Sequence, residues 1–298
     1  MNVLSIEKQT AIVAALTEGV SIRACERLHD VHRDTIMRLG VRVGVGCAKL
    51  HNALMQNLYV ARCELDEAWQ YVGKKRANVK ETDGDDVGDQ YTFIALDATS
   101  KGILAYTVGK RTSANAYRFL HDLKGRLANV PEISTDAWVG YPHAVEDTFG
   151  HAVAYGTVDK KYAAGGDSPE AARRYSPARV VDVVYETVLG TPKHISTSYV
   201  ERQNLSLRMG QKRYARLSNG FSKKLENHMA ATALYVSHYN LCRVHEALRV
   251  TPAMHLGVTD HVWTISELVN AALNGVVPEV TSRKIGRFTV IDGGAGNR

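Results

Sequence analysis

The stretch CELDEAWQYVG, residues 63–73, decides the fold of this chain. Side chains alternate between the two faces of a β-strand, so Glu64 and Asp66 share one face while Leu65 points to the other. A carboxylate inside a strand is costly to bury unless a metal ion or a charged partner balances it. The stretch therefore predicts a strand with a functional carboxylate, and Asp66, followed by Trp69, is the strongest candidate.

The segments that follow this strand are typical of an α/β domain. In order, the expected elements are strands at 91–99 and 102–110, a helix at 114–127, a strand at 132–135, a helix at 141–149 and a strand at 151–155. Three strands, a helix, a strand, a helix and a strand is the order of an RNase H-like core, in which helices flank a mixed sheet. Residues 196–208 and 221–245 then predict helices, whereas residues 156–194 show no clear pattern.

The first 58 residues predict an all-α helix-turn-helix domain. Residues 5–18 place apolar side chains at helical spacing, Ser21 can cap a second helix, and a third begins at Arg33 and runs through Val43. In such a module the second helix of the pair enters the DNA major groove with its N-terminal residues. The residues expected to contact DNA are Arg33, Thr35 and Arg38. A small three-helix packing domain would give the same pattern.

Length and composition narrow the class of protein. With 298 residues, of which 45% are hydrophobic and 23% charged, the chain can form a sizeable core and more than one domain. No apolar run approaches the roughly 20 residues that span a bilayer, and the N-terminus lacks the apolar core of a signal peptide. The four cysteines lie far apart without a CxxC pair, which excludes a disulfide framework. We therefore expect a cytoplasmic protein with no membrane partner.

The net charge of +6 is unevenly distributed. Residues 201–250 contain nine Lys and Arg against three Asp and Glu, while residues 64–100 are acidic. Basic regions on both sides of an acidic one suggest a polyanionic partner and a carboxylate-rich site between them. Chance clustering on solvated helix faces is the alternative.

Three carboxylates lie where an RNase H-like topology places metal ligands. Phosphoryl chemistry with divalent ions needs oxygen ligands from several elements, because two hard cations sit about 3.5 to 4 Å apart. In this topology the ligands lie on the first strand, at the end of the fourth and on a late helix, and the matching residues are Asp66, Asp136 and Glu201. Asp136 could instead cap the helix after it. Asp97 is a rival first ligand, although a turn-stabilising role explains it more simply.

Longer motifs around these residues resemble a known family. The strings LDEAWQYVG (65–73), STDAWVGY (134–141) and YVERQNLSLR (199–208) resemble the three catalytic blocks of DDE transposases from bacterial insertion sequences, most closely the insertion sequence 1 family. HYNLCRVHEALRVTPA (238–253) is similar to the segment after the catalytic helix in related integrases. The resemblance covers roughly residues 62–256.

The resemblance implies a function, a metal and partners. Asp66, Asp136 and Glu201 would hold two Mg²⁺ ions, for which Mn²⁺ can substitute, and Glu67, Trp69, Trp138 and His245 would support them. The expected activity is cleavage at the ends of the element followed by strand transfer. The partners would be double-stranded DNA, as terminal repeats and target, and further copies of the chain assembled on DNA in the bacterial nucleoid.

Basic and polar residues near the third block would contact phosphates beside the scissile bond. They are Arg202, Asn204, Arg208, Lys212, Arg213 and Arg216. The expected domains are then the helix-turn-helix at 1–58, the catalytic core at 59–256 and a C-terminal helix with a flexible tail at 257–298. The interval between the second and third ligands is long for the family, so we interpret residues 156–194 as an insertion.

The chain also departs from the family pattern. Ala137 replaces the usual glycine after the second aspartate, and Gln203 stands where a histidine is common. The N-terminal zinc-binding cysteine cluster of the family is missing. Three other functions remain open: an RNase H-like nuclease that cuts without joining, a non-catalytic DNA-binding regulator, and an inactive transposon remnant.

Overall fold

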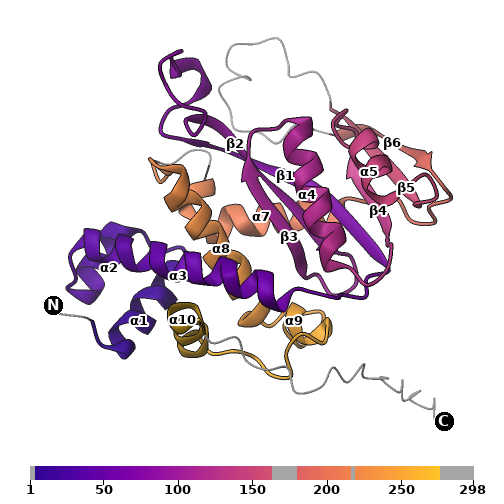
Figure 1. The fold of residues 1–298 in the computed structure, drawn as a ribbon. Coiled ribbons are helices and arrows are strands. Elements are labelled where there is room, and N and C mark those ends of the chain that lie inside the picture. The colour runs from indigo at the N-terminus through magenta and orange to yellow at the C-terminus, as the bar shows by residue number, and fades with distance from the viewer. Residues whose placement is uncertain (1–3, 163–179, 216–218, 276–298) are drawn as a thin grey trace, which may run out of the picture.

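The computed structural model describes residues 4–162, 180–215 and 219–275 (Figure 1). Its helices are α1 (Ile6–Thr17), α2 (Ile22–His29), α3 (Arg33–Leu54), α4 (Ser113–Arg126), α5 (Pro142–Phe149), α7 (Ser198–Gly210), α8 (Leu225–Leu241), α9 (Pro252–His255) and α10 (Ile265–Asn274). Its strands are β1 (Arg62–Val72), β2 (Gly88–Asp97), β3 (Ile103–Gly109), β4 (Glu132–Asp136), β5 (Tyr155–Tyr162) and β6 (Val180–Leu189).

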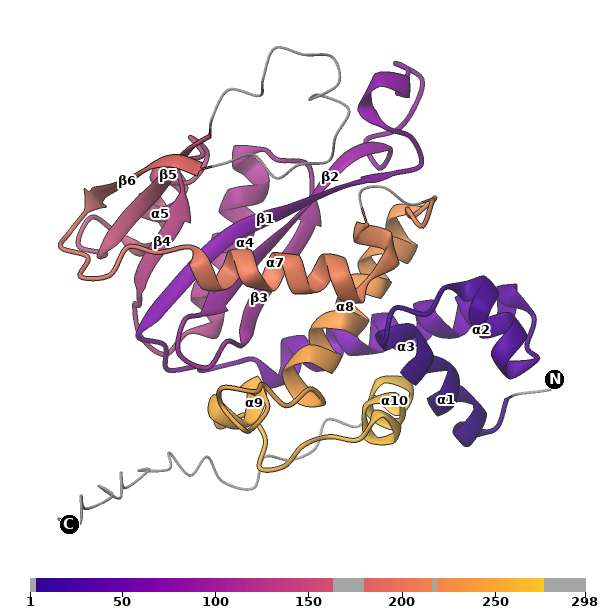
Figure 2. The same ribbon diagram turned by 180° about the vertical axis from the view of Figure 1, so that it is seen from behind.

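The strands form one six-stranded mixed sheet in the order β3-β2-β1-β4-β5-β6. Strand β2 pairs antiparallel with both β3 and β1. Strands β1, β4 and β5 run parallel to one another, and β6 returns antiparallel to β5. Helices α4 and α5 cover one face, and α7 crosses β1 on the other (Figures 1 and 2). This arrangement confirms the RNase H-like α/β fold that the order of elements predicts.

Strand β1 lies in the middle of the sheet, and each of its two faces packs against a different layer. Leu65 packs with Phe93 and Phe119 beneath α4, while Ala68 packs with Val200 and Leu207 of α7. Its parallel pairing with β4 joins Arg62 to Glu132 and Glu64 to Ser134. Continued by two residues, the same register places Asp66 opposite Asp136.

The N-terminal helices share a core with the C-terminal ones. Helix α3 packs along α8 and α10, and Gly44 and Gly46 of α3 lie so close to the backbones of Ala230 and Ala272 that any β-carbon would clash. One apolar cluster continues from these helices into the sheet. The expected domain boundary at residue 58 falls between α3 and β1 and remains a prediction.

Three elements differ from the sequence-based expectation. Helix α3 continues to Leu54, well beyond Val43, and its Gly44 and Gly46 serve close helix packing instead of ending the helix. Strand β5 begins at Tyr155, where the expected strand at 151–155 ends. Strand β6 lies in the segment interpreted as an insertion, and most of its side chains are exposed, so it lacks the apolar alternation of a half-buried strand.

The predicted flexible tail lies outside the described residues, as does Arg216. No helix in the described ranges is long and apolar enough to cross a membrane.

Candidate active site

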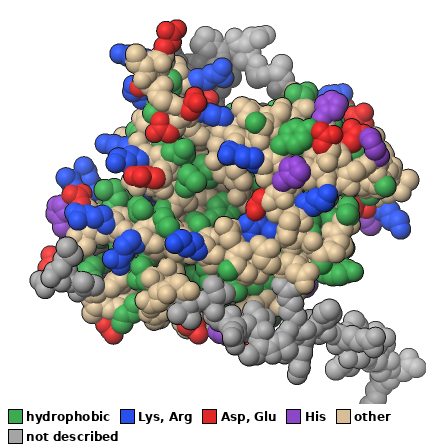
Figure 3. All heavy atoms as spheres, viewed as in Figure 1, with side chains coloured by type: hydrophobic (Ala, Val, Ile, Leu, Met, Phe, Trp, Pro, Cys, Tyr) green, Lys and Arg blue, Asp and Glu red, His purple; other side chains and the backbone are tan. Residues whose placement is uncertain are grey.

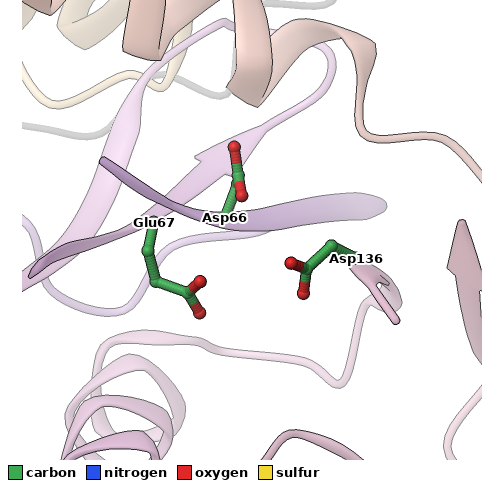
Figure 4. A group of neighbouring side chains, drawn as sticks. All are labelled: Asp66, Glu67 and Asp136. Atoms are coloured by element: carbon green, nitrogen blue, oxygen red, sulfur yellow. The ribbon is translucent and has the colours of Figure 1, made fainter. Parts of the chain in front are cut away.

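Neighbouring strands bring carboxyl groups together. Carboxylate oxygens of Asp66, Glu67 and Asp136 lie within 4.8 Å of one another (Figure 4). Asp66 and Glu67 project from opposite sides of β1, and Asp136 extends from the end of β4 toward them. Two of the three predicted ligands are therefore adjacent, and the third member of this group is Glu67, which we expected only in a supporting role.

Asp66 is held from helix α7. The side-chain amide of Asn204 donates a hydrogen bond to Asp66 Oδ2 over 2.8 Å. Burial raises the pKa of Asp66 to about 6, and the negative charges of Asp136 and Glu201 add to the rise. Burial and the neighbouring acids thus disfavour the ionised form of Asp66, and a bound divalent cation would reverse that effect.

This raised pKa makes the stability of the metal-free protein depend on pH. Because the pKa of Asp66 is about 6 in the folded state against 3.8 ordinarily, the folded protein binds the extra proton between these values. The free energy of unfolding should therefore fall as the pH rises through that window, by on the order of 1–3 kcal/mol. Denaturant unfolding with a chelator should show Asp66→Asn more stable than the wild type at pH 7.5 but not at pH 4.5. Equal differences at both pH values would contradict this expectation.

Asp136 closes strand β4 with both of its oxygens engaged. Oδ1 accepts a hydrogen bond from the Trp138 backbone over 3.1 Å, and Oδ2 accepts one from Arg111 Nη2 over 2.8 Å. Helix α5 begins only at Pro142, and no side chain caps it. The alternative that Asp136 caps that helix is therefore wrong.

The buried Glu67 and the partly exposed Arg111 form an ion pair beside Asp136. The distance from Arg111 Nη2 to Glu67 Oε2 is 3.0 Å, and the Glu67 side chain is only 2% exposed. Burial, followed by the charge of Asp136, raises the pKa of Glu67 to about 8. The guanidinium also lies over the rings of Trp138 and Tyr91, at 4.7 and 5.8 Å from their centroids.

Glu201 lies near this group, but its carboxylate is not among the three whose oxygens lie within 4.8 Å of one another. It lies in the first turn of α7, where Thr197 donates a hydrogen bond to Oε1 over 2.6 Å. Lys160 of β5 contacts both of its oxygens. Its side chain is 40% exposed, and its charge contributes to the raised pKa of Asp66. The structure thus pairs the predicted third ligand with a lysine.

Helix α7 is fixed to β1 at two points. Glu64 Oε2 accepts hydrogen bonds from the backbones of Tyr199 and Val200, over 2.8 and 3.0 Å, at the start of the helix. One turn further, Asn204 holds Asp66. Because Glu64 and Asp66 share one face of β1, the alternation of this strand positions the helix that carries Glu201.

The predicted phosphate contacts have different surroundings. Arg202 and Lys212 are exposed and Arg208 is partly buried. Arg213 instead donates a hydrogen bond from Nη1 to the Ser222 hydroxyl over 3.0 Å. Asn204 is 2% exposed and its side-chain amide is bonded to Asp66. It therefore does not face solvent, as a residue that contacts a phosphate would.

The predicted supporting residues fall into two groups. Trp138 lies against Arg111 and meets Tyr141 edge to face, and Trp69 pairs across the sheet with Tyr91, so both border the Glu67 side of the site. His245 lies in the turn after α8, where the charged groups that affect its pKa are Lys101, Arg243 and Glu246.

The departures from the family pattern have local explanations. Gln203 is buried and donates a hydrogen bond to the Tyr235 hydroxyl over 3.0 Å. Ala137 is not among the residues with positive φ, so this turn does not require glycine. Asp97 accepts hydrogen bonds from the backbones of Thr99 and Ser100, which confirms its turn-stabilising role.

Sequence reasoning missed Arg111 and Lys160, the two cations of the site. The sheet order contained a signal for Arg111: β3 runs parallel to β1 and β4, so the residues that follow β3 lie at the same edge as Asp136. Lys160 gave no such signal, because β5 lies within a region where the sequence showed no clear pattern.

Helices α2 and α3 lie where the sequence predicts a helix-turn-helix. Asp30 adopts the left-handed conformation between them, with φ 50°, and the His32 side chain accepts a hydrogen bond from the Asp34 backbone at the start of α3. Arg33 and Arg38 are exposed and Thr35 is partly so. Several Lys and Arg side chains lie on the surface of α2 and α3, among apolar and acidic ones (Figure 3).

Comparison with known proteins points to one family. Residues 60–157 match the family model described as IS1 transposase. The insertion element iso-IS1n protein InsB of Shigella dysenteriae is 25% identical over 174 residues, which are 58% of this chain and 92% of that protein. The crystal structure of the Mos1 Strand Transfer Complex aligns with 80% of this chain and 79% of that one. The sequence identity is 11% and the TM-score is 0.21, so the structural similarity is weak. The family match contains Asp66, Glu67, Arg111 and Asp136, and together with the relative it shows that this chain is similar to transposases of the insertion sequence 1 family.

Proposed function

We propose that this chain binds the ends of its insertion sequence and catalyses metal-dependent DNA cleavage and strand transfer with Asp66, Asp136 and Glu201. The observation that carries the proposal is the convergence of carboxylates from separate elements. Asp66 and Asp136 approach within 4.8 Å, and Glu201 lies on the helix whose Asn204 is bonded to Asp66. Carboxylate oxygens on several sides are what Mg²⁺ and Mn²⁺ require.

The donor set fits divalent cations. Burial raises the pKa of Asp66, and the negative charges of Asp136 and Glu201 raise it further, an effect that a bound divalent cation would offset. Divalent ions held by these carboxylates would lower the pKa of a water molecule and stabilise the leaving oxygen at phosphorus. The protein would contribute the fixed positions of Asp66 and Asp136, and Glu201 after its release from Lys160.

Joining would use the same site. Hydrolysis at the end of the element leaves a 3′-hydroxyl, which would then attack a target phosphodiester in line. Arg202 and Lys212, exposed on and just after α7, would contact phosphates beside the reacting bond. Both ends of the element must be held at once, so we expect two or more copies of the chain on DNA.

A joining assay tests this function. The purified chain, Mg²⁺ and duplexes taken from the two ends of its own element should yield nicked and then joined products. Nicking without joining would favour the nuclease alternative. DNA binding by folded protein with no chemistry would favour the non-catalytic regulator and would refute both enzymatic functions.

The N-terminal helices are proposed to read the element ends. We expect Arg33→Ala and Arg38→Ala each to weaken binding of an end duplex. Loss of a phosphate contact should lower the salt dependence of binding by about one ion, whereas loss of a base contact should relax the sequence preference. Lys49→Ala is the matched control, because Lys49 is exposed on the same helix but far from its N-terminus. Titrations at several salt concentrations would measure this. Equal effects of all three changes would contradict recognition by the start of α3.

A further inference from the structure

Arg111 links two carboxylates through a single nitrogen. Its Nη2 lies 3.0 Å from Glu67 Oε2 and 2.8 Å from Asp136 Oδ2. Trp138 and Tyr91 flank the guanidinium, and Glu67 beneath it is almost fully buried. The aromatic rings and the buried acid hold the cation in place, so Asp136 meets a fixed hydrogen-bond donor.

Asp136 has few other contacts that would fix the orientation of its carboxylate. It is the last residue of β4, and its side chain is 36% exposed. The only other hydrogen bond to its carboxylate within the described residues comes from the Trp138 backbone to Oδ1. With Arg111 on Oδ2, both oxygens have one protein donor each, and the carboxyl plane is fixed while each oxygen keeps a free lone pair.

We propose that Arg111 is a positioning residue that orients Asp136 for metal binding, and that Glu67 anchors Arg111 and is not itself a metal ligand. This inference rests on the proposed function, because it assigns roles around the same carboxylates. Groups that orient metal ligands commonly change metal affinity or activity by about 10–100-fold when they are removed.

The competing interpretation is that Glu67 completes the metal site. Its oxygens lie within 4.8 Å of those of Asp66 and Asp136, and Oε1 has no hydrogen-bond partner among the described residues. Two observations favour the anchoring role. Oε2 is already engaged by Arg111. Glu67 also projects from the side of β1 opposite to Asp66 (Figure 4), and it is Asp66 that is bonded to Asn204 of helix α7.

Paired variants separate the two interpretations. Arg111→Met removes the donor, whereas Arg111→Lys can still place one ammonium nitrogen between the carboxylates. Glu67→Gln keeps an acceptor oxygen for Arg111 but is a poor ligand for Mg²⁺, and Glu67→Leu removes the acceptor. Each variant would be tested for Mn²⁺ binding by electron paramagnetic resonance, with and without an end duplex, for DNA nicking, and for thermal unfolding in chelator.

The proposal predicts a specific pattern. Arg111→Met and Glu67→Leu should each slow nicking by about 10–100-fold, and Arg111→Lys should recover most of that loss. Glu67→Gln should bind Mn²⁺ within a few-fold of the wild type, whereas Asp66→Asn should lose binding. If Glu67→Gln loses Mn²⁺ as Asp66→Asn does, or if Arg111→Met nicks at the wild-type rate, the proposal is wrong.

Failure of the proposed function would look different. In that case the wild type itself would neither bind Mn²⁺ at this site nor nick DNA. A variant that unfolds at the wild-type temperature yet nicks slowly supports the positioning role. If every loss of nicking tracked a loss of folded protein, and Arg111→Lys restored neither, Arg111 would have only a structural role and the proposal would fall.

Discussion

Asp66→Asn should abolish metal-dependent DNA cleavage while the protein still folds and binds DNA. Asparagine keeps the shape of the side chain. It also keeps an oxygen that can accept the hydrogen bond that the Asn204 amide now donates to Asp66 over 2.8 Å. It loses the charge that a divalent ion needs, and metal ions contribute several kcal/mol to stabilising the transition state. A loss of about 10³-fold or more in cleavage rate is therefore expected, measured in single-turnover reactions with an end duplex.

The matched control for this change is Asp97→Asn. Asp97 is buried on the neighbouring strand β2, and its carboxylate accepts hydrogen bonds from Thr99 and Ser100 in a turn. We expect this variant to lose some stability but to cleave DNA when folded. If Asp66→Asn retained the wild-type cleavage rate, or if Asp97→Asn lost cleavage while folded, Asp66 would not be the first ligand.

Glu201→Gln should cause a loss of similar size, about 10³-fold. Glu201 is the third carboxylate that the two-metal arrangement needs, and Lys160 and Thr197 hold it in the structure. The α7 helix should remain in place in this variant, because Glu64 and Asn204 fix it independently of Glu201. Cleavage assays over a range of Mn²⁺ concentrations would separate loss of a ligand from loss of DNA binding.

Glu186→Gln serves as the control for removing one negative charge. Glu186 is an exposed residue of β6, the strand next to the one that carries Lys160. Its replacement should leave cleavage unchanged. Wild-type cleavage by Glu201→Gln would show that Asp66, Glu67 and Asp136 form the metal site without it, and the proposed triad would then be wrong.

The fold was predictable from the sequence because its signals are local. The period of two in residues 63–73 and the order of the following strands and helices predict an RNase H-like sheet, and the structure has it. Strand β6 was not predictable, because its apolar residues Val181, Val184 and Tyr185 are exposed and do not alternate. The length of α3 depends on how closely Gly44 approaches α8, which no local pattern reveals.

The site was predictable only in part, for a different reason. Strand order and motif spacing pointed to Asp66 and Asp136, but their actual approach depends on the register between β1 and β4. The partners of these acids come from distant parts of the chain: Arg111 follows β3, and Asn204 lies on α7. Long-range contacts of this kind follow from the folded geometry, so sequence reasoning assigned Asn204 to DNA and did not single out Arg111.

One measurement tests the metal assignment most directly: the anomalous scattering of Mn²⁺ in crystals of the protein with an end duplex, recorded at the manganese absorption edge. The account predicts anomalous peaks bound by Asp66 and Asp136, with Glu201 released from Lys160 to complete the ligand set and Arg111 still between Glu67 and Asp136. A peak bound by Glu67 with Glu201 still paired to Lys160, or no peak at these carboxylates in a DNA-bound complex, would contradict it.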